Sequence, residues 1–119
     1  MSAIFIEKSS DDTVRSHSWH LWSSWALSLN PMDELLGLER SDSFKCYPEL
    51  VALVSCPQDP IWHPEGDVWA HTKLVVGEAA RIAVERSLSP EERLTLLFSA
   101  LCHDFGKPHT TTHEADGRI

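Results

Sequence analysis

The chain has 119 residues, 42% of them hydrophobic and 24% charged, which fits one small globular domain and excludes a disordered or fibrous protein. The formal net charge is −8, with nine acidic and four basic residues in 1–60 and nine and six in 61–119. Because no basic segment is available to neutralise a phosphate backbone, tight electrostatic binding of a nucleic acid is not expected. This charge balance does not exclude the binding of one phosphate through a metal ion.

The cysteines and the N-terminal residues indicate in which cellular compartment the protein is expected. Cys46, Cys56 and Cys102 form no Cys-x-x-Cys pair, and Cys102 lies in an apolar run where a free thiol packs as a small hydrophobic group. The apolar run at residues 3–6 is too short for a signal sequence or a membrane span. We therefore expect a cytoplasmic protein that does not bind a membrane.

The first half of the chain predicts helices of decreasing length. Apolar side chains recur at spacings of three and four over residues 13–29, which predicts a helix. Asn30 caps a second, short helix that has Pro31 at its first position. Pro48 opens a brief apolar segment over residues 49–54. Each of these segments has a start signal for a helix and lacks strand-like alternation.

The second half predicts a loop and two further helices. Three prolines and Gly66 exclude regular structure over residues 56–67, and Asp67 then caps a long helix over 68–88. One face of that helix carries Val75, Ala79 and Ile82. Ser89-Pro90-Glu91-Glu92 is a capping box, and its helix runs to His103-Asp104, where Gly106 and Pro108 stop it before a polar tail. The predicted fold class is all-α.

Three residues are candidates for metal ligands. His71 lies four residues before Val75 on the apolar face, a position that a hydrogen-bonded core histidine also fits. His103 and Asp104 are adjacent at the end of an apolar helix. An unpaired buried carboxylate costs several kcal/mol, so this pair requires a metal ion or a cationic partner. The alternative is that Asp104 simply pairs with Lys107 or Arg93.

Two imidazoles and a carboxylate suit a borderline or hard divalent ion such as Mg²⁺, Mn²⁺ or Ni²⁺. Such an ion binds a phosphoryl oxygen and acidifies a bound water. Lys107 follows closely enough to contact the phosphate, and a solvent-facing lysine is the alternative. His63 either lines the site or orients Glu65, and a hydrogen bond that stabilises the loop is the alternative.

These residues carry a resemblance to a known family. His71 followed by His103-Asp104 and then Gly106-Lys107 resembles the HD superfamily of metal-dependent phosphohydrolases. The blocks YPEL, PQDP, WHPEGDVWAHT and LCHDFGKP are similar to the HD domain of bacterial CCA-adding tRNA nucleotidyltransferases, and residues 25–47 resemble the linker helices that precede it. The resemblance covers residues 22–119.

The resemblance implies an HD-domain-like helical bundle that is incomplete at its C-terminus, with linker-type helices over residues 1–46 and a partial HD domain over 47–119. It also implies hydrolysis of phosphomonoesters and 2′,3′-cyclic nucleotides, beside a tRNA-maturation activity. A phosphate ester or nucleotide is then the substrate, and direct tRNA binding by this chain alone is not expected.

Site roles follow from the same resemblance. His71, His103 and Asp104 would be metal ligands, and Asp104 and Lys107 would act in catalysis. His63, Glu65 and Lys107 are the candidates for substrate binding.

The sequence departs from the family pattern at both ends. No Gly-Ser motif with paired aspartates precedes residue 22, so we expect no addition of CTP or ATP. The family motif needs a final Asp on a later helix, whereas the sequence given ends at Asp116-Gly117-Arg118-Ile119. We expect either a truncated reading frame or a shortened piece of a longer protein, with weak hydrolysis. Replacement ligands could come from His109, His113, Glu114 and Asp116, although solvated loop residues are the expected alternative.

A second hypothesis belongs to a different class: a catalytically inactive remnant or interaction module that forms a homo-oligomer or associates with a missing partner domain. Trp19, Trp22 and Trp25 recur every three residues and could stack on bases, but the acidic charge favours packing in a core or an interface. Some of them would be exposed where helices are missing.

Overall fold

The computed structural model describes residues 10–110 of the chain. In chain order the elements are α1 (Ser10–Leu27), α2 (Pro31–Glu39), the 3-10 helix η2 (Asp42–Cys46), α3 (Pro48–Val51), α4 (Val68–Glu85), α5 (Pro90–Cys102) and α6 (Lys107–Thr110). No strand occurs between residues 10 and 110. The predicted all-α class is therefore confirmed.

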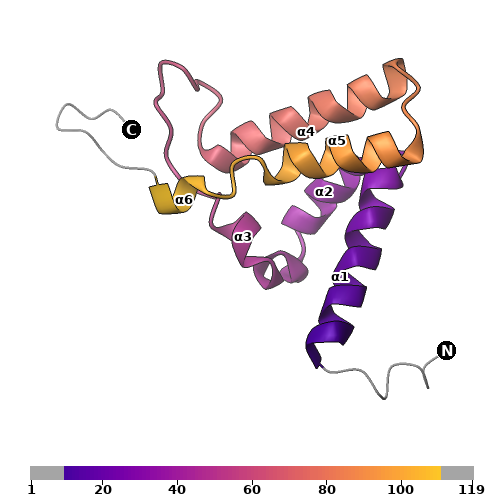
Figure 1. Ribbon diagram of the computed structural model, residues 1–119. Helices are drawn as coiled ribbons and strands as arrows, with labels where there is room; N and C mark the ends of the chain where they lie inside the picture. The colour runs from indigo at the N-terminus through magenta and orange to yellow at the C-terminus, as the bar shows by residue number, and fades with distance from the viewer. Residues whose placement is uncertain (1–9, 111–119) are drawn as a thin grey trace.

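The helices α4 and α5 pack side by side as an antiparallel pair, and α1, α2 and α3 lie on one side of this pair (Figure 1). Both α4 and α5 begin with the predicted caps. The side chain of Asp67 accepts a hydrogen bond from the Ala70 N–H at 2.8 Å. Ser89 and Glu92 form a reciprocal capping box, with bonds of 3.2 and 2.9 Å. These bonds satisfy N–H groups that a helix start would otherwise leave without a partner.

The turn between the two helices is short because α4 ends in a left-handed residue. Ser87 has φ 49°. Its N–H donates to the carbonyl of Val84 at 3.1 Å, and the Leu88 N–H reaches back to Ala83 at 3.0 Å. This pair of bonds is a Schellman motif, which reverses the chain directly into the cap of α5.

One hydrophobic core joins α4 and α5 to the N-terminal helices. Its members come from both sides of the predicted boundary at residue 46: Trp25, Ala26, Leu35, Leu50, Leu53, Cys56, Val68, Trp69, Val76, Ala79, Ala83, Leu97, Ala100 and Leu101. Trp25 also donates its indole N–H to the Pro31 carbonyl at 2.7 Å. The division into linker helices and a partial HD domain stays a prediction, and the two parts share this core.

A side chain of α5 fastens the end of α1. The guanidinium of Arg93 donates to the carbonyl oxygens of Ala26 at 3.2 Å and Ser28 at 2.8 Å. These bonds supply positive charge and donors to the C-terminal end of a helix, where carbonyl groups lack partners. In Figure 1 the C-terminal end of α1 lies beside the helical hairpin that α4 and α5 form, and the rest of α1 extends away from this hairpin.

The tryptophans of α1 differ in burial. Trp25 is in the core as expected, and Trp22 is partly buried with edge contacts to Trp25 and Tyr47. Trp19 is 62% exposed and stacks on Phe98 at 6.1 Å between ring centroids. Core packing therefore holds for Trp22 and Trp25 but not for Trp19.

Several expectations need correction. Asn30 precedes α2, but its side chain makes no capping hydrogen bond. Cys102 is exposed and is not packed as a small hydrophobic group. The chain after Pro108 is not simply a tail, because His109 and Thr110 belong to the single turn α6 (Lys107–Thr110). Pro108 is tolerated near a helix start, where its missing N–H would have no partner. On α4, Ala79 is buried as expected, but Val75 and Ile82 are only partly buried. The most buried line runs through Val68, Thr72, Val76, Ala79 and Ala83, because α4 packs on α2 as well as on α5.

Across residues 10–110, no helix combines the length and the apolar character that crossing a bilayer requires.

The core position of α5 makes a first testable prediction. Leu97 is 0% exposed, so Leu97→Ala should lower the free energy of unfolding by about 2–5 kcal/mol through lost contacts and a residual cavity. Urea denaturation measures this. Leu74→Ala on α4 is the matched control, since Leu74 is 57% exposed and should change stability by about 0.5 kcal/mol or less. Equal effects of the two substitutions would contradict the packing.

Candidate metal centre

The hairpin brings His71 and the His103-Asp104 pair to the same end of the molecule. His71 lies 14 residues before the last residue of α4, and His103 lies 13 residues after the first residue of α5. At about 1.5 Å of rise per residue, both are roughly 20 Å from the turn that joins the antiparallel helices. His103 is the C-cap of α5, and Asp104 lies in the turn that follows.

The three predicted ligands converge. His71, His103 and Asp104 each offer one ligand atom, and these atoms lie within 4.8 Å of one another. His103 Nε2 is 3.0 Å from Asp104 Oδ2, and the His71 and His103 ring centroids are 5.6 Å apart. The side chains are 25%, 35% and 15% exposed, respectively. The expected proximity is confirmed, whereas the role as metal ligands stays a prediction.

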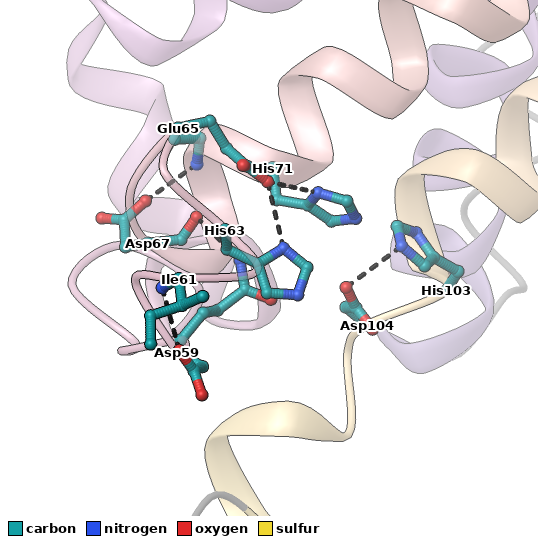
Figure 2. Close-up of polar contacts among 10 residues, drawn as sticks. Asp59, Ile61, His63, Glu65, Asp67, His71, His103 and Asp104 are labelled. Atoms are coloured by element: carbon teal, nitrogen blue, oxygen red, sulfur yellow. Dashed lines mark hydrogen bonds and ion pairs between the residues drawn. The ribbon is translucent and has the colours of Figure 1, made fainter. Parts of the chain in front are cut away.

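Hydrogen bonds determine which ring nitrogens face this group. His71 Nδ1 is 2.7 Å from Glu65 Oε2, and His103 Nδ1 is 2.7 Å from the Ala100 carbonyl oxygen. A carboxylate and a carbonyl only accept hydrogen bonds, so Nδ1 is the donor in both rings. The electron pair of each neutral ring is then on Nε2. In Figure 2 this nitrogen of His71 lies on the side facing His103 and Asp104.

This donor set fits a divalent ion. A neutral His103 directs the electron pair of Nε2 toward an oxygen of Asp104 3.0 Å away, and two acceptors at this distance need a shared cation or a proton. Two neighbouring ligands of an octahedral ion, each at about 2.1 Å, are also roughly 3 Å apart. Imidazole and carboxylate ligands together suit Mn²⁺, Ni²⁺ or Zn²⁺ better than Mg²⁺, because Mg²⁺ prefers oxygen ligands alone.

Glu65 connects the centre to the loop before α4. Its Oε2 accepts from His71 at 2.7 Å and from His63 at 3.2 Å, and these three residues form a second group whose ligand atoms lie within 4.8 Å (Figure 2). Its own backbone N–H, followed by His63 and His71, lowers the pKa of Glu65 to about 2. The carboxylate is therefore ionised at neutral pH. The contact between His63 and Glu65 lies within the loop, so it fits both the orientation of Glu65 and the stabilisation of the loop.

Asp67 fixes the position of this loop. Its Oδ2 accepts from the Ser55 N–H at 2.7 Å while Oδ1 caps α4. The next two N–H groups donate to carbonyl oxygens before the loop, Val68 to Cys56 at 2.9 Å and Trp69 to Leu53 at 3.0 Å. Both ends of the loop are thereby tied to the first turn of α4, which carries His71.

Backbone turns inside the loop place His63 and Glu65. The carboxylate of Asp59 accepts from the Ile61 N–H at 2.9 Å, and its carbonyl accepts from the His63 N–H at 2.8 Å. Gly66 has φ +125°, a conformation that other residues rarely adopt, and it directs the chain from Glu65 into the cap of α4.

The remaining candidate residues have different outcomes. Arg93 bonds to the end of α1, so the alternative in which it pairs with Asp104 is wrong. Lys107 is partly buried at the start of α6, and its N–H donates to the Asp104 carbonyl at 3.0 Å, while its role toward phosphate stays a prediction. His109 is exposed on α6. His113, Glu114 and Asp116 lie outside the described residues.

Sequence reasoning did not predict the contact between Glu65 and His71. A signal for it exists: Glu65 precedes the capping residue Asp67 by two positions, so its backbone must lie beside the first turn of α4. His71 is in that turn. The backbone acceptor of His103, the Ala100 carbonyl three residues earlier, follows from the end of a helix, where carbonyl groups lack partners.

Comparisons with known proteins give partial similarities. No protein-family model matches the chain, and no solved structure matches it. The multifunctional CCA protein of Tolumonas auensis is 41% identical over 66 residues, which are 56% of this chain and 14% of that protein. The multifunctional CCA proteins of Actinobacillus pleuropneumoniae serotype 5b and Mannheimia succiniciproducens are 39% and 35% identical over 79 residues, or 60% of this chain and 18% of each relative.

The chain spans less than a fifth of the length of these relatives, so the similarity concerns one segment of a much longer protein. Over that segment, the chain is related to the multifunctional CCA proteins.

Proposed function

We propose that this chain is a metal-dependent phosphohydrolase domain of the HD type, in which His71, His103 and Asp104 hold one divalent ion. The observation that carries the proposal is the convergence of these three side chains from the facing ends of α4 and α5. Both histidines donate through Nδ1 to other groups, which leaves Nε2 available to the ion.

The protein residues have separate tasks in this proposal. When bound, the ion supplies a positive charge for a phosphoryl oxygen and lowers the pKa of a water molecule. Asp104 has two carboxylate oxygens, so one would hold the ion while the other would accept a proton from a water molecule. Lys107, three residues later at the start of α6, supplies positive charge for the substrate phosphate. His63 and Glu65 border the site from the loop.

The proposed substrates are phosphomonoesters and 2′,3′-cyclic nucleotides. The relatives bear the name multifunctional CCA protein. The resemblance to CCA-adding tRNA nucleotidyltransferases supports an ester at the end of an RNA chain. The net charge of −8 opposes contact with a long phosphate backbone by this chain alone. We propose that tRNA, where it is involved, is held by another domain or subunit, and that the protein acts in the cytoplasm.

Metal binding tests the centre. Calorimetric titration with nickel or manganese should give about one ion per chain. Asp104→Asn should weaken binding at least about tenfold, near 1.4 kcal/mol, because it removes the one anionic ligand. Asp33→Asn is the matched control, since Asp33 is exposed in the first turn of α2. Identical isotherms for the wild type and Asp104→Asn would refute the centre.

Hydrolysis tests the activity. The purified chain should hydrolyse p-nitrophenyl phosphate and 2′,3′-cyclic AMP with added manganese or nickel, and a chelator should remove this activity. His71→Ala should lower the rate at least about 100-fold, near 2.7 kcal/mol in the barrier, because an ion with fewer ligands is poorly held. His20→Ala, at an exposed histidine of α1, is the control. Metal binding without hydrolysis would instead support the non-catalytic module.

A further inference from the structure

We propose that Glu65 is a positioning residue: it holds His71 with the proton on Nδ1 and the electron pair of Nε2 directed at the metal, and His63 in turn holds Glu65. The inference rests on the proposed metal centre and adds a carboxylate–histidine–metal arrangement to it.

The contact itself is the first step. Glu65 Oε2 and His71 Nδ1 are 2.7 Å apart, a length typical of a charge-assisted hydrogen bond. An imidazole that donates to a carboxylate becomes a better electron-pair donor at its other nitrogen and keeps a fixed ring orientation. His71 therefore gains both basicity and direction from a residue outside its own helix.

The comparison of the two histidines is the second step. His103 donates to a neutral acceptor, the Ala100 carbonyl, at the same distance of 2.7 Å. The backbone of α5 supplies that acceptor, so no side-chain substitution removes it. His71 lies in the first turn of α4, where its Nδ1 bonds to the loop instead. Glu65 thus accepts the hydrogen bond from Nδ1 of His71, as the helix backbone accepts the one from Nδ1 of His103.

The environment of Glu65 is the third step. Its side chain is 20% exposed, and the oxygen that accepts from His71 also accepts from His63 at 3.2 Å. The His63 and His71 rings meet edge to face, with centroids 5.0 Å apart. Two donors on one oxygen restrict the rotation of the carboxylate. His63 is therefore part of the support of the centre.

A competing assignment uses the same residues. The group of His63, Glu65 and His71 also meets the distances for a metal ion, which would then take Glu65 as a direct ligand. In that arrangement His71 binds the ion through Nδ1 and carries its proton on Nε2. The two assignments differ in the tautomer of one ring, and nitrogen NMR reports that tautomer.

The experiment compares the wild type with Glu65→Ala and Glu65→Gln in long-range proton–nitrogen NMR of the histidine rings, with His71→Gln to assign the signals. Metal-free wild type should show His71 protonated on Nδ1, and added zinc should shift the Nε2 signal. Glu65→Ala should move the tautomer toward Nε2–H. Glu65→Gln retains an acceptor oxygen, so it should retain the tautomer.

Nickel affinity, measured by calorimetry, is the second readout. It should fall about 10–100-fold in Glu65→Ala and less in Glu65→Gln. Glu34→Ala, at an exposed residue of α2, is the control and should bind as the wild type does. If Glu65 only stabilised the loop, Glu65→Ala would lower the melting temperature. It would then change neither the tautomer of His71 nor the nickel affinity relative to Glu65→Gln.

The outcomes separate the two proposals. Wild type that binds no nickel overturns the metal centre, and the inference about Glu65 with it. If the wild type and Glu65→Ala bind nickel equally well, the inference about Glu65 is overturned and the metal centre is retained. A His71 ring protonated on Nε2 in the metal-free wild type overturns it as well, and favours the competing group.

Discussion

The antiparallel packing of α4 on α5 is the constraint on which the rest of the structure depends. His71 and His103 meet because they are nearly the same number of residues from the turn, 14 and 13. Adding one residue to either helix between the turn and the site would shift a ring by about 1.5 Å and rotate it by roughly 100°. The Schellman motif at Ser87 and the capping box at Ser89 define where each helix stops and starts, and so define this register.

The loop before α4 supports the centre through charge and hydrogen bonds. The carboxylate of Asp67 joins the loop to the helix, and the carboxylate of Glu65 joins the loop to His71. Neither contact requires a large core, which suits a chain of 119 residues with a limited buried volume. The arrangement places ionised and neutral ligands together at a partly buried position, where an ion is attracted more strongly than at an open surface.

The helices could be predicted because their signals are local. Asp67 and Ser89 cap helices where the sequence indicated, and the class is all-α. Pro108 was expected to end regular structure, but a proline at the start of a turn loses nothing. The prediction of the buried face of α4 was only partly right. Spacings of three and four fit two neighbouring faces of a helix, and only the packing partners select one.

The contact of Glu65 with His71 could not be predicted from periodicity, because Glu65 lies in an irregular loop. The path of this loop is determined by its hydrogen bonds to other parts of the chain. The HD assignment depends on sequence blocks, and the similarity to multifunctional CCA proteins covers part of the chain.

The central claim is that two histidines, one from each helix of the hairpin, bind the same ion. X-ray absorption spectroscopy of the nickel complex tests it most directly, because imidazole rings add a distinct multiple-scattering signal that can be counted. The account predicts two imidazole ligands in the wild type and one in His71→Ala. An unchanged count in His71→Ala, or a wild-type ion surrounded by oxygen ligands alone, would contradict it.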